Sequence, residues 1–335
     1  MDAPSRTKLP SQVSPQGSSD GSTAVGSGSS RLSRREALHA AVLACCGAAF
    51  GRAANAAEAA LITKPIPSTG ERLPVIGLGT DSFGEAELAA VRAVITRMHE
   101  LGGTVVDTAA SYGDSEALIG DALAATGLRK SMFLATKLTD GGGFFGGIGG
   151  DASFERSLKR LRTSRVDLLQ VHNLQGVDTL MPLLRQWKSA GRIRYYGVTT
   201  SRVSQHDELI DVMRKHPLDF IQVDYSIANR DAERTILPLA AERRMAVLVN
   251  LPLIHGRLMR QVAASPLPAF AGEIGVRSWA QLLLKYVVSH PTVTCAIPGT
   301  TQAAHLADDQ AAGRGILPDA AMRRRMETYW ARTFG

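Results

Sequence analysis

Four side chains in this sequence could together carry out acid–base chemistry on a carbonyl group. Asp107 and Tyr112 lie close together in VVDTAASYG, Lys137 lies in FLATKL, and His172 lies in DLLQVHN. A tyrosine phenol has an ordinary pKa of about 10, so it responds as an acid at neutral pH only where a cation stabilises the phenolate. Lys137 would supply that cation, Asp107 would pair with the lysine, and His172 would offer an N–H to the carbonyl oxygen.

A proton donor beside an electron-poor carbon is what the reduction of an aldehyde or ketone requires. The hydride must come from a cofactor, because no side chain can provide one. Each of the four residues also has a structural interpretation, as a buried ion pair, a packed tyrosine or a histidine with a satisfied polar group. Their order, with each following an apolar run, favours the joint catalytic interpretation.

Eight short apolar runs alternate with longer amphipathic stretches, which predicts parallel strands joined by helices. The expected strands are 75–79, 104–107, 132–137, 166–172, 193–199, 220–224, 246–251 and 292–298. The expected helices are 85–102, 114–126, 151–163, 177–190, 203–216, 231–243, 276–289 and 301–312. This pattern predicts an α/β fold, a single-domain (β/α)8 TIM barrel over residues 57–335, with a hairpin in 61–74 closing its bottom.

An open doubly wound sheet is the alternative fold, but GLGTDSFG lacks the third glycine of its phosphate loop. In a barrel, the working residues lie at the C-terminal ends of the strands. That rule selects the four residues above, which fall on consecutive strands, and a further group. The further group is Gly79 to Asp81, Thr199, Thr200, Gln222 to Tyr225, Asn250 and Gly299 to Thr301.

The segments GLGT, DTAASYG, LATK, SLKRLRTSRVDLLQVH, GRIRYYGVT, FIQVDYS and IPGTTQAAHL resemble, in this order, motifs of the aldo/keto reductases. The resemblance covers nearly all of residues 73–312. It implies a barrel that binds NADPH or NADH in an extended form and acts on a small-molecule carbonyl substrate. It also implies that Tyr112 is the general acid, that Lys137 and Asp107 tune it, and that His172 positions the substrate.

The resemblance assigns the nicotinamide end of the cofactor to several residues. Gln222 matches the residue that holds the carboxamide, and Gly79, Thr80 and Asp81 match the contact with the nicotinamide ribose. Thr199 and Thr200 stand where the family has Ser-Asn. Asn250 stands where the family has an aromatic residue that stacks on the nicotinamide ring, so the stack is absent or another residue supplies it.

The adenosine end departs further from the family. Gly299, Thr300 and Thr301 match the turn that contacts phosphate, ahead of a helix N-terminus that favours anions. His305 replaces the arginine for the 2′-phosphate, and Gly299 replaces a basic residue, which predicts a reduced preference for NADPH over NADH. Asp308 and Asp309, expected near the adenine, add to this effect.

Two loops remain open to more than one interpretation. His255 and Arg257 lie after the seventh strand, on the loop that closes over the pyrophosphate in this family, and Arg257 is either a phosphate ligand or a solvated charge. The glycine-rich segment TDGGGFFGGIGGD, with Phe144 and Phe145, is either a substrate lid or a flexible connector.

Residues 1–56 are expected to be a disordered leader followed by an export signal. Residues 9–30 are rich in Ser, Gly, Pro and Gln, and then Ser33-Arg34-Arg35 with Leu38 precedes an apolar run over 40–50. This arrangement resembles a twin-arginine signal, which predicts passage through that export machinery, cleavage after Ala56 and a periplasmic protein. The alternatives are an ordinary secretory signal, a cytosolic tail, and lipidation at Cys45.

The composition excludes other classes of protein. Of the formal net charge of +7, residues 1–56 carry +3 and the remainder only +4, and aromatic residues make up 5%, so no nucleic-acid partner is expected. No apolar run is long enough to predict membrane insertion, and no metal-ligand spacing occurs. Cys295, which alone remains after the signal, is expected to be a buried thiol. The alternative to an efficient enzyme is a nucleotide-binding barrel with little or no turnover that acts as a regulatory or binding subunit.

Overall fold

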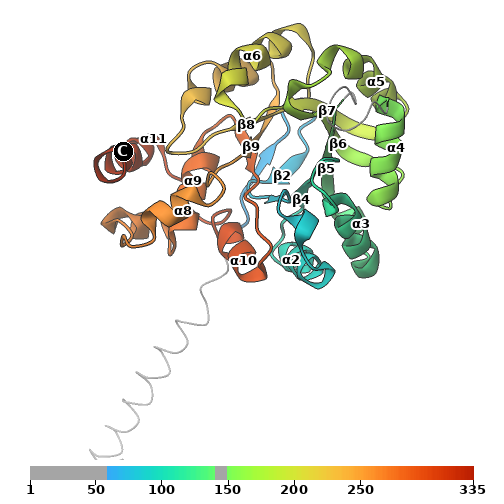
Figure 1. Ribbon diagram of the computed structural model, residues 1–335. Helices are drawn as coiled ribbons and strands as arrows, with labels where there is room; N and C mark the ends of the chain where they lie inside the picture. Colours follow the sequence, from blue (N-terminus) through green and yellow to red (C-terminus); the bar gives the residue numbers. More distant parts are fainter. Residues whose placement is uncertain (1–58, 140–148) are drawn as a thin grey trace, which may run out of the picture. The chain divides into compact units, whose positions relative to one another are not determined.

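Eight parallel strands form a barrel in the computed structural model, which describes residues 59–139 and 149–335 (Figure 1). The strands are β3 (Leu78–Gly79), β4 (Val105–Asp107), β5 (Phe133–Leu138), β6 (Val166–Val171), β7 (Ile193–Thr199), β8 (Phe220–Asp224), β9 (Ala246–Asn250) and β10 (Val293–Ala296). Each strand pairs with the next along the chain. The predicted (β/α)8 barrel is confirmed.

The first and last strands meet through isolated bridges. Ile76 pairs with Ala296 and Gly79 pairs with Gly299, and the Gly77 amide donates to the Ala296 carbonyl over 2.8 Å. A Cβ on Gly79 would lie 2.7 Å from the Ile297 carbonyl oxygen, so glycine is required where these two segments approach. The open doubly wound alternative is therefore wrong.

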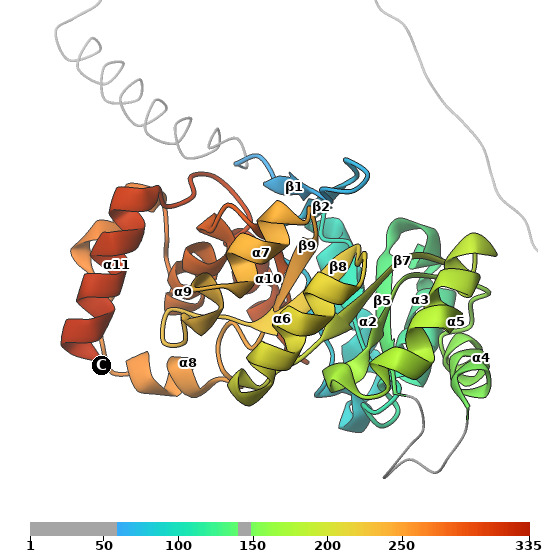
Figure 2. The same cartoon turned by 90° about the horizontal axis from the view of Figure 1, so that it is seen from above.

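Helices surround the barrel at the positions that the sequence predicts (Figures 1 and 2). They are α2 (Leu88–Glu100), α3 (Ser115–Thr126), α4 (Gly150–Arg160), α5 (Val177–Ser189), α6 (His206–Lys215), α7 (Ile236–Glu242), α9 (Trp279–Ser289) and α10 (Ala303–Ala311). The predicted starts of α6 and α7 lie too early, because the short 3-10 turns Val203–Gln205 and Asp231–Glu233 precede these helices.

Two helices were not predicted. The six-residue α8 (Arg257–Val262) follows β9, and α11 (Ala320–Thr333) packs against α9 with Met326 and Trp330 buried (Figure 2). The carboxylate of Asp319 accepts a hydrogen bond from the Met322 amide over 2.8 Å and caps the start of α11. That capping aspartate was the sequence signal for this helix.

A hairpin fills the floor of the barrel, as predicted. Its strands β1 (Thr63–Pro65) and β2 (Arg72–Pro74) are antiparallel. Ile66 and Leu73 of this segment are buried in one cluster with inward-facing strand residues such as Phe133 and Phe220. Cys295 belongs to the same cluster and is fully buried, which confirms the predicted buried thiol. Because the floor is packed, the barrel is closed at this end among the described residues.

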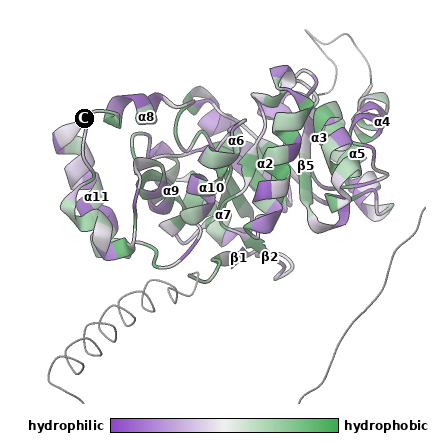
Figure 3. Cartoon of the chain, turned by 90° about the horizontal axis from the view of Figure 1, so that it is seen from below, coloured by the Kyte–Doolittle hydropathy of each residue, from purple (hydrophilic) through white to green (hydrophobic). Residues whose placement is uncertain are grey.

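A larger apolar cluster lies between the barrel and its helices. In Figure 3, the helices around the barrel carry both hydrophobic and hydrophilic residues. Within residues 59–139 and 149–335, no helix has the length and apolarity needed to cross a bilayer. The expected leader and export signal, and most of the glycine-rich segment with Phe144 and Phe145, lie outside the described residues.

Candidate active site

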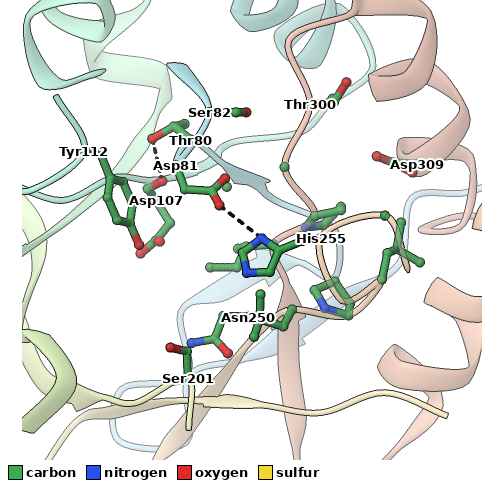
Figure 4. A pocket seen from close by; sticks show the side chains of 18 of the residues that line it. Thr80, Asp81, Ser82, Asp107, Tyr112, Ser201, Asn250, His255, Thr300 and Asp309 are labelled. Atoms are coloured by element: carbon green, nitrogen blue, oxygen red, sulfur yellow. Dashed lines mark hydrogen bonds and ion pairs between the residues drawn. The ribbon is translucent and has the colours of Figure 1, made fainter. Parts of the chain in front are cut away.

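A cleft of about 840 Å³ opens at the C-terminal ends of the strands (Figure 4). Most of the predicted site residues line it. From the strand ends these are Gly79, Thr80, Asp81, Asp107, Tyr112, His172, Thr199, Gln222, Asn250, Gly299 and Thr300, and from the family resemblance His305 and Asp309. The cleft therefore lies at the end of the barrel that the strand-end rule selects.

The alternation of side chains along each strand explains why polar groups gather there. Phe133 and Ala135 of β5 point into the barrel, and Lys137 continues the same face two residues further on. Similarly, Phe220 of β8 fills the interior while Gln222 stands above it. Apolar residues thus pack the lower interior, and the polar residue at the end of each inward-facing series reaches the cleft.

Lys137 joins two of the predicted catalytic residues beneath the cleft. Its side chain is 1% exposed and forms an ion pair with the carboxylate of Asp107. The ammonium also donates to the Thr108 carbonyl over 2.9 Å and lies 3.5 Å from the hydroxyl oxygen of Tyr112. The structure therefore brings Tyr112, Lys137 and Asp107 together, as the sequence predicts.

Electrostatics set the charge states of this group. Burial alone would lower the pKa of the Lys137 ammonium, but the Asp107 carboxylate and Tyr112 raise it above its ordinary value, so the lysine stays charged. Burial raises the pKa of Tyr112, and the Lys137 ammonium opposes that rise without cancelling it. Tyr112 is consequently a protonated phenol at neutral pH, with a proton available to donate.

His172 lies beside Tyr112, directly after β6. The two rings meet edge to face with their centroids 5.7 Å apart. Burial, together with the nearby Lys137 charge, lowers the pKa of His172 to about 3, so the imidazole is neutral. Its Nδ1 lies 3.2 Å from the hydroxyl oxygen of Ser111. A neutral imidazole with a proton on the other nitrogen can donate to a carbonyl oxygen in the cleft.

Two amide groups in the cleft wall leave one buried atom each without a partner. The Thr199 hydroxyl donates to Gln222 Oε1 over 2.7 Å, and Gln222 Nε2 is left unpaired. Asn250 Nδ2 donates to the Thr200 carbonyl over 3.0 Å, and Asn250 Oδ1 is left unpaired. Since buried polar groups are usually paired, a free donor and a free acceptor in one cleft indicate a ligand with a complementary pair.

Three predicted cofactor ligands do not line the cleft. The Thr200 side chain is fully buried and donates to Gln205 Oε1 over 2.7 Å. Arg257 lines a separate surface depression with Arg260 and Trp330. Thr301 follows the phosphate turn but does not reach the cleft lining. Arg257 is misplaced because it belongs to α8, a helix that the sequence did not predict.

Several cleft residues were missed in the sequence. Ser82, Ser111, Asn173 and Ser201 line the cleft beside the predicted positions. All four lie within four residues of a strand end, so a wider window after each strand would have included them. The three serines give the cleft small, hydroxylated side chains.

The part of the cleft lined by Gly299, His305 and Asp309 carries no arginine or lysine among the described residues. Burial, reinforced by the neighbouring Asp308, raises the pKa of Asp309 to about 7. Asp81 and His255, from the loops after β3 and β9, form an ion pair over 3.5 Å across the cleft (Figure 4). A Cβ on Gly299 would lie 3.0 Å from Asp81 Oδ1, so this wall is closely fitted.

Among the described residues, no group of three or more His, Cys, Asp or Glu side chains is arranged to hold a metal ion.

Comparisons with known proteins agree with this geometry. A family model described as the aldo/keto reductase family matches residues 75–327. The methylglyoxal reductase YeaE of Escherichia coli is 32% identical over 268 residues, which cover 77% of this chain and 91% of that protein. The aldo-keto reductase YhdN of Bacillus subtilis is 30% identical over 213 residues, which cover 58% of this chain and 62% of that protein.

Solved structures give the same result. An aldo/keto reductase from Klebsiella pneumoniae in complex with NADP and acetate superposes with a TM-score of 0.65 at 28% identity, covering 78% of this chain and 93% of its own. Another aldo-keto reductase from Klebsiella pneumoniae, in complex with NADPH, gives a TM-score of 0.69 at 25% identity, covering 81% and 96%.

Proposed function

This chain belongs to the aldo/keto reductase family and is an NAD(P)H-dependent oxidoreductase, and we propose that it reduces a small aldehyde or ketone with Tyr112 as the proton donor. The observation that carries the proposal is the position of the Tyr112 hydroxyl, 3.5 Å from the buried Lys137 ammonium at the edge of the cleft. A protonated phenol beside a fixed cation can release its proton to a developing alkoxide.

The residues present fit a nicotinamide cofactor. Its carboxamide offers one carbonyl oxygen and one amino group, which match the unpaired Gln222 Nε2 donor and the unpaired Asn250 Oδ1 acceptor. When bound, the cofactor supplies the hydride that the substrate carbon receives. Tyr112 gives its proton to the carbonyl oxygen, which completes the alcohol, and solvent later restores the phenol. His172 orients the carbonyl oxygen through its ring N–H.

One of the two related structures holds NADP and the other NADPH, and we propose that this chain also accepts NADH with little discrimination. An arginine matches the 2′-phosphate geometry and charge. Here, His305 and Gly299 stand in the positions where the family carries basic residues, and Asp309 adds a carboxyl group whose pKa is raised to about 7 by burial. The cleft is therefore expected to bind the 2′-phosphate of NADPH only weakly.

The proposed substrate is a small, hydrophilic aldehyde or oxoaldehyde. Ser82, Ser111, Asn173 and Ser201 line the cleft, and Tyr112 is the single Phe, Tyr or Trp side chain in that lining among the described residues. These side chains can form hydrogen bonds with hydroxyl or second carbonyl oxygens of a substrate. The similarity to a methylglyoxal reductase supports the same class.

The test is turnover by the purified protein with NADPH or NADH and a panel containing methylglyoxal, glycolaldehyde and benzaldehyde. We expect reduction of the small polar aldehydes and a Tyr112→Phe variant that binds cofactor with unchanged affinity but loses about 10³-fold in kcat. Cofactor binding without turnover of any carbonyl would favour the nucleotide-binding barrel instead. Equal activity in Tyr112→Phe would eliminate Tyr112 as the acid.

We further propose that the chain is exported in folded form through the twin-arginine route, cleaved after Ala56, and works in the periplasm. The support is the arrangement of Ser33-Arg34-Arg35, Leu38 and the apolar run over 40–50. Fractionation of cells that express the full chain tests this proposal. Paired Arg34→Lys and Arg35→Lys substitutions should retain the protein in the cytoplasm at its uncleaved mass, and unaltered export of that variant would contradict the route.

A further inference from the structure

We propose that Ser111 is a positioning residue that holds the His172 imidazole in the tautomer with its proton on Nε2, facing the cleft. The inference rests on the proposed carbonyl reduction and deepens it. Ser111 acts through the histidine: its hydroxyl donates a hydrogen bond to Nδ1, and the free ring proton then remains on the nitrogen that can reach a substrate oxygen.

The geometry that carries the inference joins two segments distant in sequence. Ser111 lies between β4 and α3, one residue before Tyr112, whereas His172 follows β6 at the start of a short 3-10 turn. Their side chains meet with 3.2 Å between Ser111 Oγ and His172 Nδ1, and both residues line the cleft. Asn173 and Leu174 have φ values of 50° and 59°, so the backbone turns sharply after His172.

A tautomer matters here because the imidazole is neutral. Burial and the Lys137 charge lower the pKa of His172 to about 3, so a second ring proton is absent at physiological pH. A neutral imidazole has one donor and one acceptor nitrogen, and the partner of one nitrogen decides the role of the other. With the proton on Nδ1, the cleft-facing nitrogen would present a lone pair and would repel a carbonyl oxygen.

The Ser111 hydroxyl is suited to donate. Within the described residues, its contact with His172 is the hydrogen bond that its side chain makes, so the hydroxyl proton has no competing acceptor there. If the Ser111 hydroxyl instead accepted a hydrogen bond from His172 Nδ1, the hydroxyl's own proton would have no acceptor at this half-buried site. Donation to Nδ1 pairs both groups, and this is the arrangement that leaves Nε2 protonated.

The consequence for catalysis is measurable. Replacing Ser111 with alanine removes the partner of Nδ1 and lets both tautomers populate, so part of the enzyme cannot donate to the carbonyl. The loss of one neutral hydrogen bond predicts a fall of roughly fivefold to tenfold in kcat/KM. Cofactor affinity should not change. Ser111→Thr keeps a hydroxyl at the same position and should restore most of the activity.

The experiment is ¹⁵N NMR of the full chain labelled at histidine, without cofactor, with His172 assigned from the signals lost in His172→Gln. The wild type should show a protonated Nε2 and an unprotonated Nδ1 at pH 7, and Ser111→Ala should shift both signals toward the exchange average of the two tautomers. Ser201→Ala removes another cleft hydroxyl and is the control, with no effect expected on the His172 signals.

The outcomes separate this inference from the proposed function. A proton on Nδ1 in the wild type, or unchanged His172 signals in Ser111→Ala, overturns the inference even if kcat/KM falls, because Ser111 would then act on the substrate directly. The NMR measurement needs no turnover, so it decides the tautomer even if no tested carbonyl is reduced. Absence of turnover with the expected tautomer counts against the proposed substrate class alone.

Discussion

The Lys137 ammonium lies 3.5 Å from the Tyr112 hydroxyl oxygen while it pairs with the Asp107 carboxylate on its other side. The buried Lys137 ammonium thus lies between the Tyr112 phenol, which must keep its proton, and the Asp107 carboxylate, which must stay ionised. Burial raises the pKa of Tyr112, and Lys137 opposes that rise. The lysine therefore limits how far burial raises the pKa of the Tyr112 phenol.

The first prediction concerns the pH dependence of carbonyl reduction. Tyr112 must be protonated to act as the acid, and its pKa lies above the ordinary value of about 10, so kcat/KM should stay flat up to at least pH 9. The His172 pKa of about 3 predicts no loss of activity as the pH falls through 6.5. A profile of kcat/KM from pH 5 to 10 tests both limits, and an acidic midpoint near 6.5 that disappears in His172→Gln would contradict the second.

The second prediction concerns the buried ion pair. Asp107→Leu leaves the Lys137 charge without its partner, and Lys137→Met does the same to Asp107, so each should lower the free energy of unfolding by about 3–5 kcal/mol. The double variant removes both charges and should be more stable than either single variant, yet inactive. Urea denaturation of the four proteins measures this coupling. Additive losses in the double variant would mean that the pair is not coupled.

The third prediction concerns stability in acid. His172 has a folded-state pKa depressed to about 3, so its neutral form stabilises the fold above the unfolded-state pKa of about 6.5. That contribution is lost as the pH falls from about 6.5 toward 3, by up to about 1.4 kcal/mol per pH unit. Denaturation between pH 4 and 7 should show a shallower pH dependence in His172→Gln than in the wild type.

His255→Gln, at an exposed imidazole, is the matched control for the loss of a histidine. His290 also has a lowered pKa, of about 4, and contributes to the slope in all of these proteins, so the comparison uses the difference between slopes. Equal slopes in the wild type and His172→Gln would show that His172 is not held neutral by the fold.

The side-chain alternation along the strands explains how much of the site could be predicted. Lys137, Thr199 and Gln222 each continue an inward-facing series, so their places at the cleft follow from the strand assignments. Thr200 could have been excluded in the same way, because it follows Thr199 and takes the opposite side. Its hydroxyl indeed bonds to Gln205, away from the cleft.

The loops gave less information, because their side chains have no fixed alternation. The family resemblance suggested Arg257 as a phosphate ligand or a solvated charge on the loop after β9, whereas the chain turns into α8 there. Leu251, Ile254 and His255 have positive φ values, from 48° to 51°, in that loop. Residues other than glycine rarely adopt this conformation, so their sequence does not predict these three positions of the turn. The pairing of His255 with Asp81 depends on it and could not be foreseen.

The fourth prediction concerns the choice between NADPH and NADH. His305 lines the cleft without the charge and planar geometry of an arginine. His305→Arg should therefore raise the affinity for NADPH by roughly tenfold and leave that for NADH within about twofold, since hydrogen bonds to charged groups contribute about 1.5–3 kcal/mol. Isothermal titration with both nucleotides measures the ratio. A hundredfold preference for NADPH in the wild type would contradict the weak 2′-phosphate binding that we infer from His305 and Gly299.

The fifth prediction assigns the two unpaired amide atoms to the two ends of the carboxamide. Asn250 Oδ1 can accept from the carboxamide amino group while its own nitrogen is held by the Thr200 carbonyl, and Gln222 Nε2 can donate to the carboxamide oxygen. A cofactor analogue with an acetyl group in place of the carboxamide keeps the oxygen and loses the amino group. Asn250→Leu should therefore weaken the natural cofactor about tenfold and leave the acetyl analogue unaffected.

Gln222→Leu is the matched variant for this test, because it should weaken the natural cofactor and the acetyl analogue equally. Dissociation constants of both nucleotides for the wild type and the two variants complete the comparison. Equal weakening of both nucleotides by Asn250→Leu would mean that Asn250 supports the site through packing, since a packing loss does not depend on the amino group. Selective loss of the natural cofactor requires a hydrogen bond from that amino group, and Asn250 Oδ1 is the unpaired acceptor placed to receive it.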